Sequence, residues 1–567
     1  RKQSLFGGIA VATFTALLLQ AQPAAAQYDS MMQGLKGWSA APILTVGEEI
    51  GDYTPIGELD GTGAFDLDGS HVRVLVNHEL LNFLGSAYEV SDGSGGSFEL
   101  TGSRISYFDI DKATRQIVAA GLAYDTIYDA NGAVATDNTF LQDGFAGFSR
   151  FCSAVLIEPQ QFGGGRGLED RIYFAGEEDG GGFNGVGGAE WALDPATGTI
   201  WQIPAMGHGA WENVTELDTG SADHVAFILA DDTSPINFDD DEENEAAPLY
   251  LYIGEKNAAG DFLARNGLRD GTLYVWAAKN GEASPLDFNG TSGPKKLRGR
   301  WVALDNTPQP GNASEDGTSG FDEYGYPTQS NLWLQAKAAG AFGFSRPEDV
   351  DVNPKKGNVF ALASTGVDTY AVDPGTGDGA DTFGTVYAIS VNFTNLSNPK
   401  RPLWGKVRIL YDGDADPTRA LRSPDNLDWS ANGKIYVQED KAEDDTLTGE
   451  PLFGPGAANP SEAGIVQMKP WRAVPRRIAK IDRNVVLDPT IPTPTDAVDV
   501  DAGESGAWES SGIVDVSELF GEAPGNLFLF TVQAHGIEDQ ADSNPTSRIV
   551  DEDLVEGGQL LFLTAPE

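Results

Sequence analysis

The chain has 567 residues and a formal net charge of −48, which comes from 85 acidic and 37 basic side chains. A surface of that sign repels nucleic acid and anionic membranes, so we exclude both as partners and expect a monomer. Solubility accounts for part of the charge, and clustered carboxylates also bind hard divalent cations.

The N-terminus is typical of an export signal. Two basic residues precede an apolar run at residues 5–19, and Ala24–Ala26 offers a small-residue cleavage site. The run is too short for a membrane span, and no later segment reaches the roughly 20 apolar residues that a span needs. We therefore expect residues 1–26 to be a signal peptide and residues 27–567 to be exported, to the periplasm or the extracellular space.

One strand pattern recurs along the chain, whereas helical periodicity is nearly absent. A short turn that contains Gly leads into alternating β-branched or aromatic residues. Spaced tens of residues apart, these hairpins predict an all-β fold, a decorated β-propeller of about six blades, with a pair of β-sandwiches as the alternative. In hairpin turns Gly supplies the positive φ angle. The turn glycines are Gly69, Gly198, Gly271, Gly357, Gly433, Gly525 and Gly558.

The insertions between these hairpins are recognisable by composition. Gly, Ser, Pro, Asn and acidic residues dominate segments 84–99, 233–247, 304–330, 441–463 and 488–506. We interpret them as loops over one propeller face, so that residues 27–567 form a single catalytic domain rather than several domains joined by linkers. One short helix is expected, at residues 331–340.

The single cysteine, Cys152, has no partner for an intrachain disulfide. A free cysteine packs well in a protein core, and this is the plain interpretation of the residue. The second interpretation is metal binding, because acidic residues gather in short motifs beside strand-like segments. A thiolate together with many carboxylates indicates a site for more than one metal ion.

Acidic residues stand at or beside the ends of several strand-like segments. Strand ends of a propeller converge on the mouth of its channel, where ligands bind, so we expect these carboxylates to meet there. Taken singly, each has the alternative of a solvated surface acid. Asp232, Asp440 and His535 occupy similar positions. The candidates in chain order are Glu79, Glu177, Glu178, Glu212, Asp231, Glu348, Asp425 and Glu509.

The run Ser345–Asp349 joins an arginine to a carboxylate just before a strand-like segment. Arg346 and Glu348 are two residues apart, so they project to one side of an extended chain. Arg is suited to gripping a pair of phosphate oxygens, and Glu to coordinating a metal ion. A surface ion pair is the alternative.

Motifs of several other chemistries do not occur. The sequence has no HExxH, no GxxxxGK[ST] and no GxSxG, and its five histidines argue against a zinc site built on imidazoles. Asp412, Asp414 and Asp416 begin like an EF-hand loop, but Pro417 stands where Gly is needed and Ser423 where Glu is needed.

In combination the motifs resemble one family, the PhoX-type alkaline phosphatases, from about Asn77 to Gly536 and in the order of that family. The family's N-H-E is Asn77–Glu79, and its single cysteine, followed downstream by a glutamate pair, matches Cys152. Its R-P-E is Arg346–Glu348, and its S-P-D-N-L is intact at Ser423–Leu427. The stretches around Glu212, Asp231, Glu509 and His535 resemble further family motifs.

The resemblance implies a secreted, metal-dependent hydrolase that converts small phosphate monoesters to inorganic phosphate. It implies a cluster of ferric iron, two ions expected, and several calcium ions. Thiolate beside carboxylates suits iron, and all-oxygen sites suit calcium. Arg346 is implied as the catalytic residue that clamps the phosphate. The implied metal ligands are Cys152, Glu79, Glu177, Glu178, Glu212, Asp231, Glu348, Asp425 and Glu509.

The chain departs from the family around its cysteine. Phe151, Ser153 and Ala154 flank Cys152 where the family has N-C-x-G-G, and Ser364–Gly366 replaces T-N-N. A non-catalytic, calcium-binding extracellular propeller with a binding or scaffolding role is therefore a second hypothesis, which needs neither iron nor Arg346. A calcium-dependent propeller hydrolase of lactones or phytate is a third, although the chain has few basic residues to clamp phytate.

Overall fold

The structure is a computed structural model, and the predicted signal peptide lies outside the residues that it describes. Most of segment 488–506 also lies outside them. The described residues are 28–142, 144–180, 185–239, 244–288, 295–367, 381–396, 401–442, 444–470, 474–487, 499, 503–537 and 554–567.

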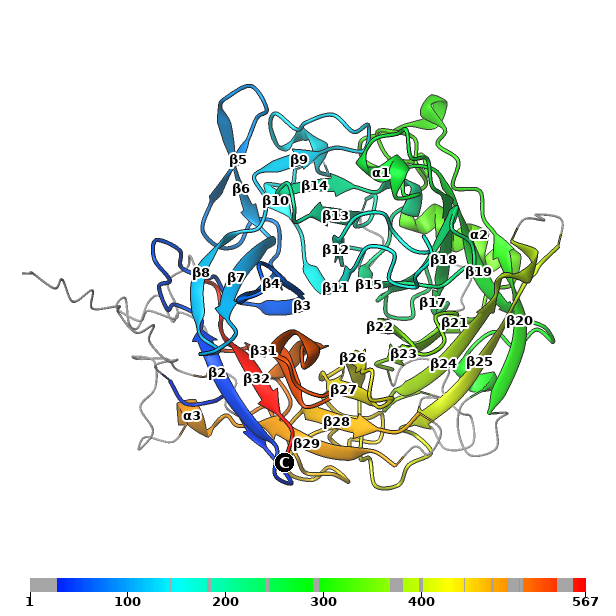
Figure 1. Cartoon of the computed structure of the whole chain (residues 1–567). Helices are drawn as coiled ribbons and strands as arrows, with labels where there is room; N and C mark the ends of the chain where they lie inside the picture. Colours follow the sequence, from blue (N-terminus) through cyan, green and yellow to red (C-terminus); the bar gives the residue numbers. More distant parts are fainter. Residues whose placement is uncertain are drawn as a thin grey trace, which may run out of the picture.

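Strands dominate the described residues and are arranged radially around a centre (Figure 1). In chain order they form six four-stranded antiparallel units, here called blades 1 to 6 and given from the centre outward. Blade 1 is β3 (Leu59–Asp66), β4 (His71–His78), β7 (Arg104–Asp111) and β8 (Ile117–Leu122). Blade 2 is β11 (Phe151–Ile157), β12 (Ile172–Glu177), β13 (Glu190–Asp194) and β14 (Thr199–Gln202). Blade 3 is β15 (Trp211–Glu216), β16 (His224–Asp231), β18 (Tyr250–Glu255) and β19 (Gly271–Ala278).

Blades 4 to 6 continue the circle. Blade 4 is β22 (Pro347–Val352), β23 (Val359–Ser364), β24 (Thr385–Asn392) and β25 (Leu403–Asp412). Blade 5 is β26 (Pro424–Trp429), β27 (Ile435–Glu439), β28 (Gly464–Met468) and β29 (Arg476–Ile481). Blade 6 is β30 (Glu509–Asp515), β31 (Leu527–Ala534), β32 (Gly557–Thr564) and β2 (Ser39–Thr45).

The blades close into a ring. The innermost strands contact one another in the cyclic order β3, β11, β15, β22, β26, β30 and back to β3. The N-terminal strand β2 pairs antiparallel with β32 and so completes the last blade. At the rim, β20 (Lys296–Ala303) pairs with both β19 and β25 and merges blades 3 and 4 into one sheet. The predicted all-β propeller is confirmed, and this strand order supports the prediction of about six blades.

The hydrophobic core is divided among the gaps between neighbouring blades. Between blades 2 and 3, Phe174 packs against Phe227 with ring centroids 5.2 Å apart. Between blades 5 and 6, Tyr436 packs against Phe528 at 4.3 Å. Because each sheet buries both faces, its strands are apolar on both sides, and the buried area between blades fixes their radial arrangement.

Helices are few and short, as the sequence predicts. The expected helix is α2 (Gln329–Ala339), whose first turn is capped by the Thr328 hydroxyl. The others in the described residues are α1 (Phe262–Arg265) and α3 (Asn484–Leu487). No helix among the described residues has the length and apolarity to cross a membrane.

Short elements decorate the blades. The strands are β1 (Met32–Gly34), β5 (Tyr88–Ser91), β6 (Ser97–Gly102), β9 (Thr126–Tyr128), β10 (Gly147–Phe148), β17 (Ala247–Pro248) and β21 (Gly343–Phe344). The 3-10 turns are η1 (Asn138–Phe140), η2 (Pro204–Met206), η3 (Pro285–Asp287), η4 (Pro310–Asn312), η5 (Phe393–Asn395) and η6 (Glu518–Phe520).

The glycine prediction is confirmed in part. Positive φ angles occur at Gly69, Gly198, Gly433 and Gly525. The prediction is wrong for Gly271, Gly357 and Gly558, which do not have positive φ angles. Gly271 and Gly558 lie inside strands β19 and β32, where the extended conformation suits any residue.

Candidate metal centre

Each blade presents two positions to the same mouth of the channel. The innermost strand is antiparallel to its neighbour, so the start of the first strand and the end of the second lie together. In five blades the second residue of the innermost strand is acidic or cysteine, and in blade 6 the first residue is acidic: Asp60, Cys152, Glu212, Glu348, Asp425 and Glu509. The residue that follows the second strand adds Glu79, Glu178, Asp232, Asp440 and His535.

A β-bulge that recurs in five blades directs one of these two side chains, the one near the start of the innermost strand, toward the mouth. In β3, two residues between Leu59 and Thr62 oppose the single Asn77 of β4. The same two-against-one register recurs in β11, β15, β22 and β26. The first residue of each bulge is Asp60, Cys152, Glu212, Glu348 or Asp425. Because a bulge breaks the pleat and redirects side chains, one local device repeated five times gathers five ligand-type residues.

Four groups of candidate ligands follow one another around the mouth. Within each group the three ligand atoms lie within 4.8 Å of one another. Neighbouring groups share one residue, first Cys152, then Glu212, then Asp425, so the groups form a continuous cluster. The groups are Asp60–Glu79–Cys152, Cys152–Glu178–Glu212, Glu212–Glu348–Asp425 and Asp425–Asp440–Glu509.

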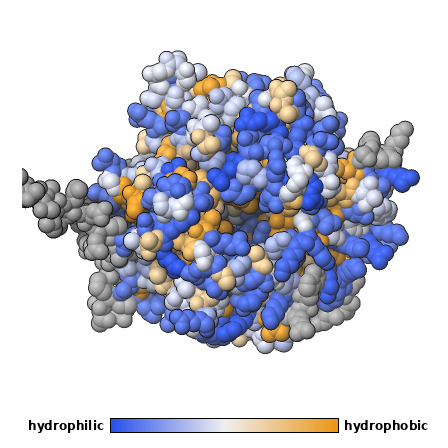
Figure 2. All heavy atoms as spheres, viewed as in Figure 1, coloured by the Kyte–Doolittle hydropathy of each residue, from blue (hydrophilic) through white to orange (hydrophobic). Residues whose placement is uncertain are grey.

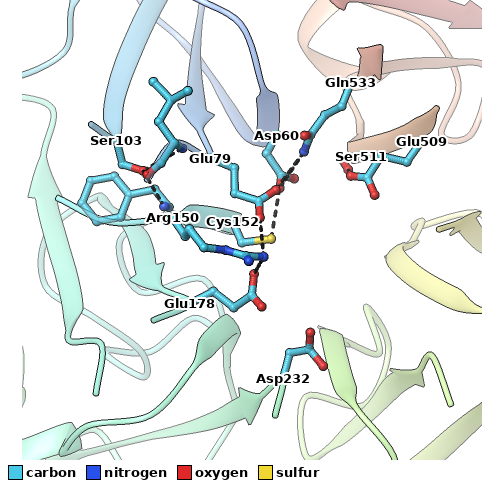
Figure 3. Close-up of polar contacts among 12 residues, drawn as sticks. Asp60, Glu79, Ser103, Arg150, Cys152, Glu178, Asp232, Glu509, Ser511 and Gln533 are labelled. Carbon is cyan, nitrogen blue, oxygen red and sulfur yellow. Dashed lines mark hydrogen bonds and ion pairs between the residues drawn. The ribbon is translucent and has the colours of Figure 1, made fainter. Parts of the chain in front are cut away.

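Figure 3 shows one end of this cluster. The Cys152 Sγ lies 3.1 Å from Asp60 Oδ2, to which Gln533 Nε2 donates a hydrogen bond of 3.2 Å. Arg150 Nη2 donates to Glu79 Oε1 at 2.7 Å and to Glu178 Oε2 at 2.5 Å. The guanidinium group of Arg150 therefore already holds together two carboxylates that belong to neighbouring groups.

Arg346 also lines the hollow and is held in place by two carboxylates. Its Nε and Nη2 donate to the two oxygens of Asp232 at 2.9 and 2.6 Å. Its Nη2 also lies 3.1 Å from Glu348 Oε1. The backbone φ angle of Arg346 is 54°, in the left-handed region that non-glycine residues rarely adopt. This conformation and the Asp232 fork fix the guanidinium at the edge of the cluster.

The hollow has a volume of about 480 Å³ and is strongly acidic. Ten carboxylates line it, against Arg150, Arg346, Lys441 and His535. It lies where the innermost strands converge, and the face shown in Figure 2 is hollowed near its centre. Such an excess of buried negative charge requires cations or protons.

The pKa values of most carboxyl groups in the cluster are raised, as expected for so many buried acids close together. Burial raises the pKa of Asp60, Glu212, Glu348, Asp425 and Glu509 well above the usual range, and nearby carboxylates raise it further. Burial likewise raises the pKa of Glu178 to about 8, although Arg150 opposes the shift, and it raises that of the Cys152 thiol. Glu79 is the exception: burial raises its pKa, but Arg150 and hydrogen bonds outweigh burial and lower it.

The donor set fits bound metal ions. Asp60 Oδ1 and Glu212 Oε1 are buried and have no hydrogen-bond partner among the described residues. An unpartnered buried carboxylate oxygen is costly unless a cation takes it. One sulfur and many oxygens, in groups compact enough for direct coordination, match a mixed set of a thiolate-binding metal and hard, oxygen-binding metals.

Most of the residues proposed from the sequence meet at this cluster. The structure brings together Arg346 and seven candidate ligands: Glu79, Cys152, Glu178, Glu212, Glu348, Asp425 and Glu509. It does not bring Glu177 and Asp231 to the cluster. Each is the last residue of its strand, and its immediate successor, Glu178 or Asp232, faces the hollow instead. Successive side chains of a strand point to opposite sides, so only one of each pair can face the hollow.

Glu177 and Asp231 are occupied by structural hydrogen bonds. Glu177 accepts from the backbone N–H groups of Ser149 and Ala189 and from Trp191 Nε1. Asp231 accepts from Trp333 Nε1 at 2.8 Å, and also from Gln329, Thr233 and Ala210. These carboxylates anchor the ends of β12 and β16, which positions Glu178 and Asp232.

Three residues of the site were missed or only noted in passing. Asp60 precedes the resemblance and stands in an inconspicuous L-D-G run. Arg150 lies two residues before Cys152, as Arg346 lies two residues before Glu348. Asp440 was noted at the end of a strand but was not chosen. The position within the blade could have found Asp60, the second residue of an innermost strand, and Asp440, the residue after its neighbour. For Arg150 the signal is the G-F-S-R run that it shares with Arg346.

No curated protein matches the chain in sequence. Among solved structures, Pseudomonas fluorescens PhoX in complex with vanadate, a transition-state analogue, matches with a TM-score of 0.57 and 13% identity. The match covers 96% of this chain and 97% of that one, so it supports the propeller fold of the whole chain. A GH43 β-1,3-galactosidase with galactodeoxynojirimycin matches with a TM-score of 0.30 and 10% identity, over 73% of this chain and 91% of that one.

One family model also matches. The model of the alkaline phosphatase PhoX family covers residues 203–467, which include Glu212, Arg346, Glu348 and Asp425. Over these residues the chain matches the alkaline phosphatase PhoX family, the family to which the sequence resemblance pointed.

Proposed function

We propose that the chain hydrolyses small phosphate monoesters to inorganic phosphate at a multinuclear metal centre in the acidic hollow. The observation that carries the proposal is the continuous run of four ligand groups with a fixed arginine, Arg346, at its edge. The family match, and the vanadate that the similar Pseudomonas fluorescens protein binds as a transition-state analogue, support a phosphate ester as substrate.

The ligand atoms divide the cluster into a part that contains sulfur and a part that contains only oxygen. Cys152 belongs to two of the four groups, which would hold the iron ions, two being expected. The two all-oxygen groups, around Glu348 and Asp440, would hold calcium. Metal ions bound there supply Lewis acidity and neutralise the charge of the phosphate oxygens.

Arg346 is proposed to clamp the phosphoryl group. Asp232 accepts hydrogen bonds from Nε and Nη2 of Arg346. Among the described residues Nη1 has no acceptor, so it is free to donate to a phosphate oxygen. Fixed in advance by Asp232, the guanidinium needs no reorganisation as negative charge moves toward the leaving group.

His535 is proposed to donate a proton to the leaving group. It lines the hollow at the end of β31, and its Nδ1 lies 2.7 Å from Glu556 Oε2. Burial would lower its pKa, but the ion pair with Glu556 and the charge of Glu58 outweigh burial and raise the pKa to about 9. The imidazolium form therefore persists at mildly alkaline pH, where an acid is otherwise scarce.

We also propose that residues 1–26 direct export and that residues 27–567 act as one catalytic propeller. The family match and the basic, apolar N-terminus support export. The closed ring of blades supports a single domain, because β2 near the N-terminus completes the blade that ends the chain.

Replacing Arg346 with alanine is expected to reduce kcat/KM for p-nitrophenyl phosphate by roughly 100- to 1,000-fold, the typical cost of losing one preorganised charge donor. Elemental analysis should find the metal content unchanged, because Arg346 is not a ligand. Arg346→Lys keeps the charge but loses the fork, so it should recover only part of the activity. Turnover at the parental rate in Arg346→Ala would remove the residue from the mechanism.

Replacing His535 with glutamine is expected to affect poor leaving groups most. Hydrolysis of an alkyl phosphate should slow by roughly 100-fold, the usual scale of general-acid catalysis, whereas p-nitrophenyl phosphate, whose leaving group needs no proton, should change little. For the parent, alkyl phosphate turnover should decline at alkaline pH as His535 loses its proton. Equal losses for both substrates would contradict the proton-donor role.

The first test of the proposed function is elemental analysis of protein purified without chelator, together with p-nitrophenyl phosphate turnover before and after chelation. Iron near two equivalents with several calcium ions, and turnover lost on chelation, is the expected result. Calcium without iron, and no turnover with any phosphate monoester, would favour the non-catalytic binding propeller.

A further inference from the structure

A second acidic cavity lies in the channel behind the metal cluster. It has a volume of about 170 Å³ and is lined by the innermost strands of the blades. The same bulges that aim Cys152, Glu212, Glu348 and Asp425 at the mouth place the next residue of each strand in this cavity. These second bulge residues are Ser153, Asn213, Asp349 and Asn426.

Three carboxylates face the cavity from adjacent blades, namely Asp349, Asp351 and Asp428. Asp349 accepts backbone N–H groups on both oxygens, from Val350 at 2.6 Å and Leu427 at 2.7 Å. Backbone donors therefore hold both oxygens of Asp349, which fixes its carboxyl group in the wall of the cavity.

Asp351 and Asp428 are also held by backbone donors. Asp351 Oδ2 accepts from Trp429 N at 2.6 Å, and Asp428 Oδ2 accepts from Asp515 N at 3.0 Å. The second oxygen of Asp428, Oδ1, has no hydrogen-bond partner among the described residues. Each of these carboxylates is therefore fixed by a hydrogen bond to one oxygen. In Asp428 the other oxygen, Oδ1, remains available to a ligand.

Asn213 supplies an independent sign of a missing ligand. Gly512 N donates to Asn426 Oδ1 at 2.6 Å, which fixes that atom as an acceptor. The Ser153 hydroxyl lies 3.5 Å from the same oxygen and donates to it, so it accepts from Asn213 Nδ2 at 2.7 Å. Asn213 Oδ1 is thereby assigned as a carbonyl oxygen. It is buried without a partner among the described residues, in a residue that is 4% exposed.

No basic side chain is among the described residues that line this cavity, and burial raises the pKa of all three of its aspartates. No three of its carboxylates bring their oxygens within 4.8 Å in the described part of the chain, so they do not form a site for a bare ion. The volume has room for several water molecules, each of which occupies about 30 Å³ in the liquid. A hydrated cation is small enough to fit and can reach all these acceptors through its water ligands.

We propose that the channel cavity holds one hydrated divalent cation, separate from the cluster at the mouth. Mg²⁺ fits best, because it gives up its water ligands reluctantly and is often bound through them. The cation would satisfy Asn213 Oδ1 and Asp428 Oδ1 through water and would tie blades 3, 4 and 5 together at the axis. It is independent of the proposed catalytic function.

The test uses Asp351→Asn/Asp428→Asn, which removes two charges but keeps an oxygen for each backbone donor. Parent and variant are dialysed against chelator and loaded with Mg²⁺ alone, and in a separate sample with Ca²⁺ alone. Bound metal is then counted by elemental analysis. We expect the parent to hold one equivalent more than the variant with at least one of the two ions, and to gain more thermal stability from that ion.

A matched control is Glu89→Gln/Glu99→Gln, which removes two exposed carboxylates that face each other on β5 and β6. It should bind as much metal as the parent. Equal metal counts in the parent and the channel variant, with both ions, would overturn the proposal. So would a channel variant that is more stable than the parent in the presence of each ion, because the aspartates would then be buried acids that gain from neutralisation. A parent without phosphatase activity would leave this count, and therefore the proposal, unaffected.

Discussion

Replacing Cys152 with alanine is expected to remove the iron and at least about 100-fold of the turnover, since losing even a residue that supports a metal ligand commonly costs 10- to 100-fold. Cys152 is shared by two of the four ligand groups, so its sulfur would serve both neighbouring ions. The measurements are iron content, p-nitrophenyl phosphate turnover and the visible absorption band of thiolate bound to ferric iron. All three should fall together.

Cys152→Ser separates the two interpretations of this residue. The hydroxyl keeps the size of the side chain but replaces a soft donor with a hard one, so the visible band should vanish even if some metal remains. If Cys152 were only a core residue, both variants would keep the iron and the turnover, and Cys152→Ala would lose a modest amount of stability through the small cavity that it leaves. That outcome would contradict the ligand role.

The fold class could be predicted because its signal is local and repeated. Each hairpin carries its own turn and its own strand alternation, and a repeat of such units has few solutions other than a propeller. What the sequence could not show is how the ring closes. The pairing of β2 with β32 joins residues more than 500 positions apart, and no local pattern marks β2 as the outer strand of blade 6.

The candidate site was predictable to within one residue at several strand ends. The sequence placed carboxylates at the end of β12 and of β16, but an end is uncertain by a residue or two, and a shift of one residue reverses the direction of a side chain. Glu177 and Asp231 were therefore chosen where Glu178 and Asp232 face the hollow. At the end of β12 both Glu177 and Glu178 were proposed, so the prediction included the residue that lines the hollow.

Asp60 and Arg150 show a different limit. Neither lies in a motif with chemical meaning of its own, and each gains its role only because a bulge or a left-handed residue turns it toward the axis. The φ angle of Arg150 is 48°, close to that of Arg346, 54°, and each precedes its bulge by the same distance. The same G-F-S-R run ends at both arginines, as Gly147–Arg150 and as Gly343–Arg346, so this equivalence between two blades is present in the sequence itself.

Removing the metals is expected to make the protein sensitive to alkaline pH. In the metal-free protein, burial raises the pKa of Glu178 from 4.5 to about 8 and that of several neighbours further. Between the unfolded and folded pKa values the native state holds protons that the unfolded chain has released, so stability is present below about pH 4.5 and is lost as the pH rises toward 8. Since one pKa unit corresponds to ~1.4 kcal/mol, Glu178 alone amounts to a few kcal/mol.

Thermal unfolding from pH 5 to pH 9 checks this expectation. The midpoint temperature of the chelated protein should fall by at least several degrees as the pH rises. That of the metal-loaded protein should stay constant, because its ligands are already ionised and paired with cations. Glu190→Gln is the matched control: Glu190 is buried, has no partner on either oxygen among the described residues, and belongs to no ligand group. That variant should gain stability at pH 8 without a change in metal content. A chelated parent with a flat pH profile would show that the cluster carboxylates are not buried together, and the metal centre would then lose its electrostatic basis.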